Sequence, residues 1–109
     1  MFIITKSETY KWPVTITGID QDGKTVKQSF TAIYHRLSQS ELEEMSVTGL
    51  TDREFARKVL AGWEDVQDAD GNEVPFSSAT CERLLDNAGV AAQIVIEFTG
   101  SIGGARVKN

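Results

Sequence analysis

The chain has 109 residues, and 16 aspartate and glutamate residues against 11 lysine and arginine residues give it a formal net charge of −5. This length supports one hydrophobic core, so we expect a single domain over residues 1–109. The acidic balance argues against a nucleic acid partner, and no apolar run approaches the roughly 20 residues that span a bilayer, which argues against a membrane protein.

Residues 1–37 are predicted to form a β-rich half. The segment Val14–Ile19 alternates large and polar residues and is rich in β-branched types, as is typical of a strand. Asp20–Gly23 supplies a favoured hairpin turn, and the alternation resumes over Thr25–Leu37. We therefore expect an antiparallel β-hairpin, or a three-stranded meander if Phe2–Thr5 adds an edge strand.

Residues 38–104 are predicted to form a helical half of three to four short helices, with a short basic tail at 105–109. Ser40–Glu43 has the spacing of a capping box, in which serine and glutamate side chains satisfy each other's free backbone N–H groups. Thr51–Glu54 repeats this spacing. The helix after it is expected to bury Phe55, Val59 and Leu60 and to end at Gly62.

Two further helices complete the predicted α+β fold. The third is expected to start at Ser77 or Ser78, and Gly89 should separate it from the fourth. Residues that recur at helical spacing are expected to face the core: Cys81, Leu84, Leu85 and Ala88 on the third helix, and Val90, Ile94, Val95, Phe98 and Ile102 on the fourth.

The segment Gly62–Ser77 contains an acidic loop that resembles a metal site. Asp68, Asp70 and Asn72 alternate as do the first ligands of a calcium loop. No register, however, places both a glycine at position 6 and a glutamate at position 12, as an EF-hand requires. Turn chemistry explains these residues, so we predict a solvated turn without metal or cofactor.

The chain offers few other groups for chemistry. His35 is the only histidine, and an enzyme or metal-binding protein would have to combine it with Asp65, Asp68 and Asp70. We predict instead that His35 is a half-exposed strand residue. The single cysteine, Cys81, excludes an intramolecular disulfide and is predicted to act as a small buried hydrophobe. We therefore expect no enzymatic activity.

Read in order, the sequence resembles the small tail assembly chaperones of long-tailed bacteriophages and prophages. The resemblance rests on segments that span nearly the whole chain: Thr9–Ile16; Gln28–Leu37 running into Ser40–Glu44; Val59–Val66 with Asp70–Ser77; and Leu84–Val90 running into the final helix and Ala105–Asn109. Each motif consists of capping, turn and core residues, and it is their order that carries the resemblance.

The resemblance implies a non-enzymatic protein of the bacterial cytoplasm that is absent from the finished virion. Such chaperones coat the long, largely helical tape measure protein, keep it soluble and help tail tube subunits assemble around it. No family binding motif maps onto this sequence. Large aromatic residues are the candidate partner-binding groups, because such residues are enriched at interface hot spots. These residues are Trp63, Phe76 and Phe98.

Two other interpretations remain. One is a stand-alone protein-binding or regulatory module, which would use the same kind of apolar surface. The other is a small metal-binding protein or enzyme that uses His35 and the Asp65–Asp70 loop. For Trp63 and Phe76 a structural role is an alternative to partner binding, in which they pin the two helices at either end of the acidic turn.

Overall fold

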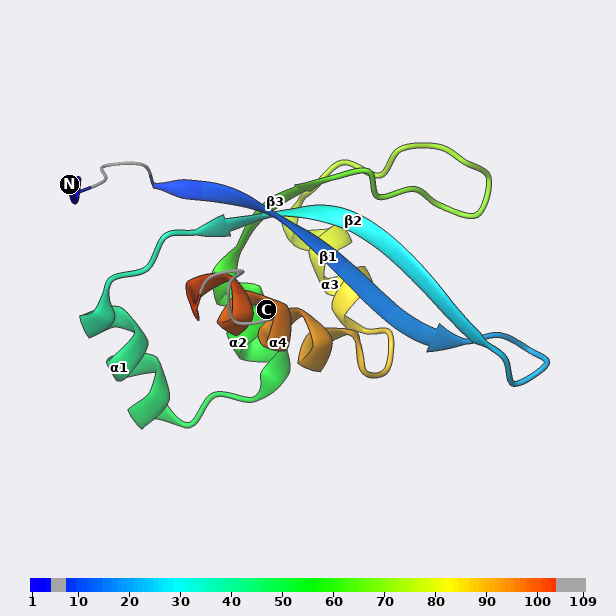
Figure 1. Cartoon of the computed structure of the whole chain (residues 1–109). Helices are drawn as coiled ribbons and strands as arrows, with labels where there is room; N and C mark the ends of the chain where they lie inside the picture. The colour runs from blue at the N-terminus through cyan, green and yellow to red at the C-terminus, as the bar shows by residue number, and fades with distance from the viewer. Residues whose placement is uncertain (5–7, 104–109) are drawn as a thin grey trace.

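A long β-hairpin is the main element of the sheet. Its strands, β1 (Thr9–Ile19) and β2 (Thr25–His35), have 11 residues each and pair antiparallel along their whole length. The computed structural model describes residues 1–4 and 8–103. The turn of the hairpin projects beyond the helices (Figure 1). The predicted hairpin is thus confirmed, because one face of each strand alternates into the core.

The third strand follows a helix and not the N-terminal segment. α2 (Asp52–Val59) begins at the predicted Thr51 capping box, and β3 (Leu60–Glu64) follows it directly and pairs antiparallel with β2. The prediction that this helix continues to Gly62 is wrong, because Gly62 pairs with Ile33 in the ladder. An apolar run of this kind fits a buried strand as well as a helix, and pairing with β2 selects the strand.

The predicted edge strand at Phe2–Thr5 does not form over the described residues. Phe2, Ile3 and Ile4 lie outside any strand and are exposed, and Thr5 is outside the described residues. The sheet order is β1-β2-β3, so β3 supplies the third strand on the far side of β2. Burial favours β3, since Leu60 and Trp63 enter the core whereas the first residues extend away from the helices (Figure 1).

The first helix begins near Ser38, as predicted, but with a different cap. α1 (Gln39–Thr48) is capped by Ser38, whose hydroxyl accepts a hydrogen bond from the backbone N–H of Glu41, so the predicted box at Ser40–Glu43 is wrong. Both serines have a glutamate three residues later, so local spacing does not separate them. The observed start brings Leu42 and Met45 against the core.

The last two helices begin where the sequence predicts. α3 (Ser78–Leu85) is capped by Ser77, and Gly89, with a φ of 83°, lies between it and α4 (Val90–Gly103). Of the predicted inward residues, Ala88 lies after α3 and is exposed, and Ile102 is exposed on α4. The tail at 105–109 is outside the described residues. The others are buried or partly buried: Cys81, Leu84, Leu85, Val90, Ile94, Val95 and Phe98.

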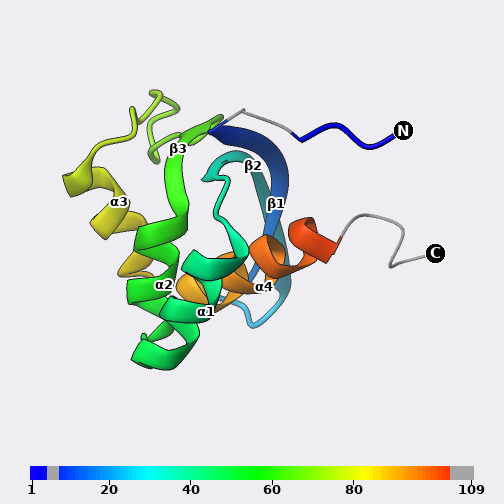
Figure 2. The same ribbon diagram turned by 90° about the vertical axis from the view of Figure 1, so that its left-hand side faces the viewer.

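The described residues form two layers, with the helices on one side of the sheet (Figure 2). In β1 and β2 the face toward the helices is built from even-numbered residues, including Val14, Phe30, Ala32 and Tyr34, all of which are buried. The fold class is α+β as predicted, although the helical half at 38–104 also contributes β3. Over the part of the chain that the structure describes, no helix is long and apolar enough to cross a membrane.

Candidate partner-binding groove

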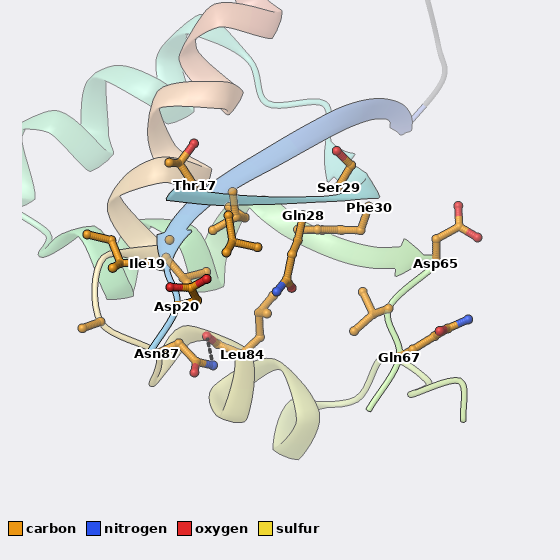
Figure 3. A pocket seen from close by; sticks show the side chains of 16 residues that line it. Thr17, Ile19, Asp20, Gln28, Ser29, Phe30, Asp65, Gln67, Leu84 and Asn87 are labelled. Atoms are coloured by element: carbon orange, nitrogen blue, oxygen red, sulfur yellow. Dashed lines mark hydrogen bonds between the residues drawn. The ribbon is translucent and has the colours of Figure 1, made fainter. Parts of the chain in front are cut away.

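An open groove of about 630 Å³ lies under the projecting half of the hairpin (Figure 3). One wall is the hairpin itself, and the other consists of the segment after β3 and the end of α3. The hairpin extends farther than the helices, so apolar residues on its inner face remain only partly covered. The apolar lining of this hairpin groove consists of Ile16, Ile19, Val26, Phe30, Val66, Leu84, Ala88 and Val90.

The rim of the hairpin groove is polar and carries acidic charge. Asp20 and Asp65 belong to it, and the lining contains no lysine or arginine among the described residues. Asp65 has a φ of 68°, the left-handed conformation that few residues other than glycine adopt. The remaining polar residues of the lining are Thr17, Gln28, Ser29, Gln67 and Asn87.

Two similar aspartate turns hold the chain at the hairpin tip and in the acidic loop. At the hairpin tip, an Asp20 carboxylate oxygen accepts hydrogen bonds from the N–H groups of Asp22 and Lys24, at 2.9 Å each. In the acidic loop, an Asp68 oxygen accepts from the N–H groups of Asp70 and Asn72, at 2.9 and 3.0 Å. Local turn chemistry therefore fixes both segments.

The acidic loop is a turn, as predicted. Gly71 has a φ of 83°, and its N–H donates to the Asp68 carbonyl oxygen at 3.0 Å. Gln67 and Glu73 form an isolated antiparallel bridge that closes the loop. Within residues 1–4 and 8–103, no three histidine, cysteine, aspartate or glutamate residues gather closely enough to hold a metal ion.

Ion pairs between α2 and α3 hold the helical wall of the groove. The Arg57 guanidinium bonds both carboxylate oxygens of Glu82, and Arg53 lies 3.3 Å from oxygens of Glu82 and Asp86. The hydrogen bond from Arg57 is the main cause that lowers the pKa of the Glu82 carboxyl. These pairs fix the position of α3, whose end supplies Leu84 to the groove.

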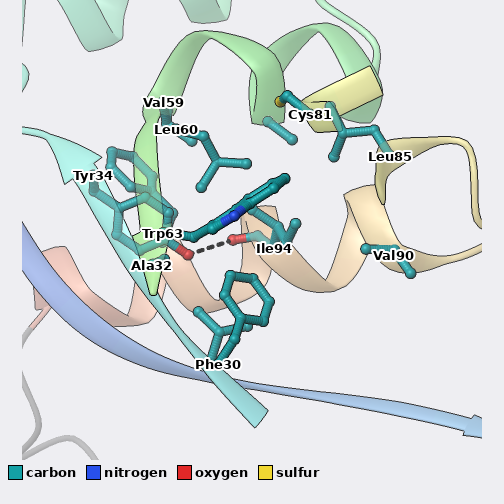
Figure 4. Close-up of a cluster of buried hydrophobic side chains, with 13 residues drawn as sticks. Phe30, Ala32, Tyr34, Val59, Leu60, Trp63, Cys81, Leu85, Val90 and Ile94 are labelled. Carbon is teal, nitrogen blue, oxygen red and sulfur yellow. Dashed lines mark hydrogen bonds between the residues drawn. The ribbon is translucent and has the colours of Figure 1, made fainter. Parts of the chain in front are cut away.

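Two of the three predicted partner-binding residues lie together. The rings of Trp63 and Phe76 pack edge to face with centroids 4.9 Å apart, and the Trp63 indole N–H donates to the Val74 carbonyl oxygen at 2.7 Å. Trp63 lies at the centre of the buried cluster, between Phe30 and Leu60 (Figure 4). This arrangement ties the end of the acidic loop to the core.

The third predicted residue, Phe98, lies elsewhere in the core. Its ring packs edge to face on Tyr34 and Phe55, with centroids 5.0 and 5.9 Å apart, and 1% of the residue is exposed. It lines a smaller hollow of about 300 Å³ beside α1 and the start of β1. The structure therefore brings Trp63 and Phe76 together but separates them from Phe98.

His35 and the loop carboxylates do not share a site. His35 is exposed and pairs with Thr9 at one end of β2, whereas Asp65 follows Glu64, which pairs with Thr31 nearer the strand's middle. Cys81 is buried, as predicted, and this burial raises the pKa of its thiol. Neither residue lines the hairpin groove.

Sequence reasoning missed the hairpin groove. Its signal was the apolar alternation at Ile16 and Val26, which continues toward the hairpin tip beyond the part of the sheet that the helices cover. The alternation predicts a groove only when the positions of α3 and α4 are known, because these helices determine which strand residues are covered.

The comparisons with known proteins place the chain in a family. No curated protein and no solved structure matches it. One protein family, described as YdaY prophage protein, matches residues 22–102. The matched region runs from the hairpin turn almost to the end of α4 and therefore includes most of the hairpin groove. Because the match covers well over half of the chain, this protein belongs to the YdaY prophage protein family.

Proposed function

We propose that this prophage protein is a non-enzymatic tail assembly chaperone that binds the tape measure protein and assists assembly of the tail tube. The observation that carries the proposal is the hairpin groove, an open apolar surface with an acidic rim, in a member of a prophage protein family. The resemblance of the sequence to tail assembly chaperones supplies the identity of the partner.

The shape of the groove suits an amphipathic helix. Its apolar lining comes from the hairpin on one side and from Val66 and Leu84 on the other, so a helix laid between the walls would bury one apolar face. Two turns of helix are about 11 Å long and present three or so apolar side chains on one face. A long, largely helical client offers many such segments.

The charge of the groove favours a particular kind of segment. Asp65 and Asp20 stand on the rim, so basic residues flanking the apolar face of a client helix would meet complementary charge. The net charge of −5 would also make chaperone-coated clients repel one another. Both effects fit a protein that keeps an apolar client soluble before assembly.

The proposal includes a location and a second partner. The chaperone acts in the cytoplasm of the bacterial host and leaves before the virion is complete. Tail tube subunits replace it along the tape measure protein, because both would cover the same apolar helical faces. The chaperone therefore has to bind weakly enough to be displaced.

A stand-alone binding module would use the same groove for another client. The gene neighbourhood separates the two functions, since a chaperone gene is expected just upstream of a tape measure gene. No specific contact among the described residues favours the enzyme or metal-binding alternative, because His35 lies apart from the loop carboxylates.

A direct test combines binding and phenotype. The tagged chain should retain the tape measure protein encoded in the same prophage, and deletion of its gene should leave that protein insoluble and stop tail formation. Absence of binding together with normal tails in the deletion strain would overturn the proposal.

A further inference from the structure

The outer edge of β1 is open along part of its length. β1 is the first strand in the order β1-β2-β3 and therefore has one edge without a neighbouring strand. At Thr17 the Gln93 side chain occupies this edge, accepting from the Thr17 N–H at 2.8 Å and donating to the Thr17 carbonyl oxygen at 3.0 Å. Along a strand, the N–H and carbonyl groups of successive residues point to opposite edges. The backbone groups of Lys11 and Thr15 therefore point to the same outer edge as those of Thr17. No partner for those groups is found among residues 1–4 and 8–103.

An unpaired apolar segment lies close to this edge in the sequence. Phe2, Ile3 and Ile4 are 88%, 72% and 81% exposed. Phenylalanine and isoleucine are strand-forming residues, and exposed apolar side chains in series favour association. The same molecule therefore carries both an open strand edge and an exposed strand-forming segment.

We propose that two copies of the chain pair through this edge, so that Phe2–Ile4 of each copy lies antiparallel along Lys11–Thr15 of the other. The contact is symmetric, since each copy gives one segment and receives one. Backbone hydrogen bonds of the new ladder satisfy the outward groups of β1, and the edge is closed by the pairing itself.

The alternation of β1 places most of its large apolar side chains on the face of the sheet toward the helices. Even-numbered residues of β1, such as Tyr10 and Trp12, face the helices and are partly buried. Phe2 and Ile4 are two residues apart, so an added strand formed by Phe2–Ile4 directs both side chains to one face. In the paired state they extend the apolar side of the partner's sheet.

Charge also favours this surface for contact between copies. Neither Met1–Ile4 nor Thr9–Ile19 contains an aspartate or glutamate, although the chain as a whole carries a net charge of −5. The stretch from Met1 to Ile19 contains one acidic residue, Glu8, and two lysines, Lys6 and Lys11, so two copies would repel each other less through this edge than through most of the acidic surface. Pro13, which has no N–H to donate, removes one bond from the ladder and limits its strength.

The test is the oligomeric state of the full chain, without any client protein. Sedimentation equilibrium in the micromolar range should show a dimer. The double variant Phe2→Ser/Ile4→Ser should weaken dimerisation by about tenfold or more, because it removes the exposed apolar contacts. The matched control Ile19→Ser replaces a residue of β1 that is 74% exposed at the other end of the strand, and it should leave the dimer intact.

A second variant tests the backbone contact. Thr15→Pro removes an outward N–H while leaving the backbone pairing with β2, and it should also weaken dimerisation by about tenfold or more. Urea unfolding of each variant confirms that the monomer is folded. A wild-type chain that is monomeric throughout this range would overturn the proposal, and so would a dimer that survives both sets of substitutions. Neither result bears on binding of the tape measure protein.

Discussion

The side-chain amide of Gln93 takes the place of a neighbouring strand at Thr17, where it bonds both the N–H and the carbonyl oxygen of one residue. Gln93 is the first of three polar residues spaced four apart on α4 that contact β1. Glu97 accepts a hydrogen bond from the Trp12 indole N–H at 3.4 Å, and Ser101 is bonded to the Tyr10 hydroxyl at 2.7 Å. This polar stripe, Gln93, Glu97 and Ser101, ties α4 to the edge strand.

Substitution of Gln93 tests whether the stripe stabilises the fold. Gln93→Ala removes two hydrogen bonds and should lower the free energy of unfolding by about 1 kcal/mol, since water replaces part of what is lost. Gln93→Glu keeps the acceptor for the Thr17 N–H but sets a carboxylate oxygen against the Thr17 carbonyl oxygen and a like charge four residues before Glu97, so it should cost at least as much as Gln93→Ala. Urea unfolding measures both, and equal stability of the wild type and Gln93→Ala would show that the contact contributes nothing.

The bond from Trp63 to Val74 should stabilise more than the one from Trp12 to Glu97. Trp63 is buried and its bond is 2.7 Å long, whereas Trp12 is only partly buried and its bond is 3.4 Å long. Trp63→Phe should therefore cost about 2 kcal/mol and Trp12→Phe about 1 kcal/mol or less. Urea unfolding of the two variants compares them directly, and a larger cost at Trp12 would contradict this account of the core.

Much of the local structure could be predicted because it depends on neighbours in sequence. The turns at Asp20 and Asp68 and the helix caps at Thr51 and Ser77 each satisfy backbone N–H groups within a few residues. The cap at Ser38 shows the limit of such reasoning, since Ser40 has the same spacing to a glutamate.

The parts that were missed depend on residues far apart in the sequence. Leu60–Glu64 becomes a strand because it pairs with β2, and nothing within the segment marks the change from helix to strand. The hairpin groove gathers residues from Ile16 to Val90, so it exists only after the helices pack. Trp63 and Phe98 were singled out as large aromatic residues, and size alone does not separate a core position from a surface contact.

The aspartate turns should depend on the carboxylate as a hydrogen-bond acceptor and not on bound metal. Asp68→Ala should lower the free energy of unfolding by about 1 kcal/mol because it leaves two backbone N–H groups without their partner, while Asp68→Asn should cost less. Urea unfolding checks these values. A calcium titration followed by tryptophan fluorescence should give no saturable change, and a micromolar response would contradict the turn interpretation.

The ion pair between α2 and α3 predicts a dependence of stability on pH. The pKa of Glu82 is lowered from its usual 4.5, mainly by the hydrogen bond from Arg57. The stability this group contributes is therefore fully present above pH 4.5 and is lost as the pH falls through the lowered value. Glu82→Gln should make the acid loss of stability shallower than in the wild type. Chemical unfolding at a series of pH values measures this loss of stability. An equally steep loss in Glu82→Gln and in the wild type would contradict the stabilising role of the Glu82–Arg57 pair.

The conformation of Asp65 separates a structural from a binding role for this residue. Because its φ is 68°, Asp65→Gly should leave stability unchanged or raise it by about 0.5–1 kcal/mol. The same substitution removes a charge from the rim of the hairpin groove, so it should weaken client binding. Thermal unfolding and client affinity, measured on the same protein, distinguish the two effects; lower stability with unchanged affinity would assign Asp65 a structural role.

The most direct test of the central claim is a binding titration of the purified chain with segments of the tape measure protein from the same prophage. The groove variant Val26→Asn/Asp65→Asn should bind about tenfold more weakly than the wild type. The matched control Val47→Asn/Glu44→Gln removes one apolar and one acidic side chain from α1, at the opposite end of the molecule from the hairpin turn (Figure 1), and should bind like the wild type. Absence of binding by the wild-type chain, or equal binding by the two variants, would contradict the account.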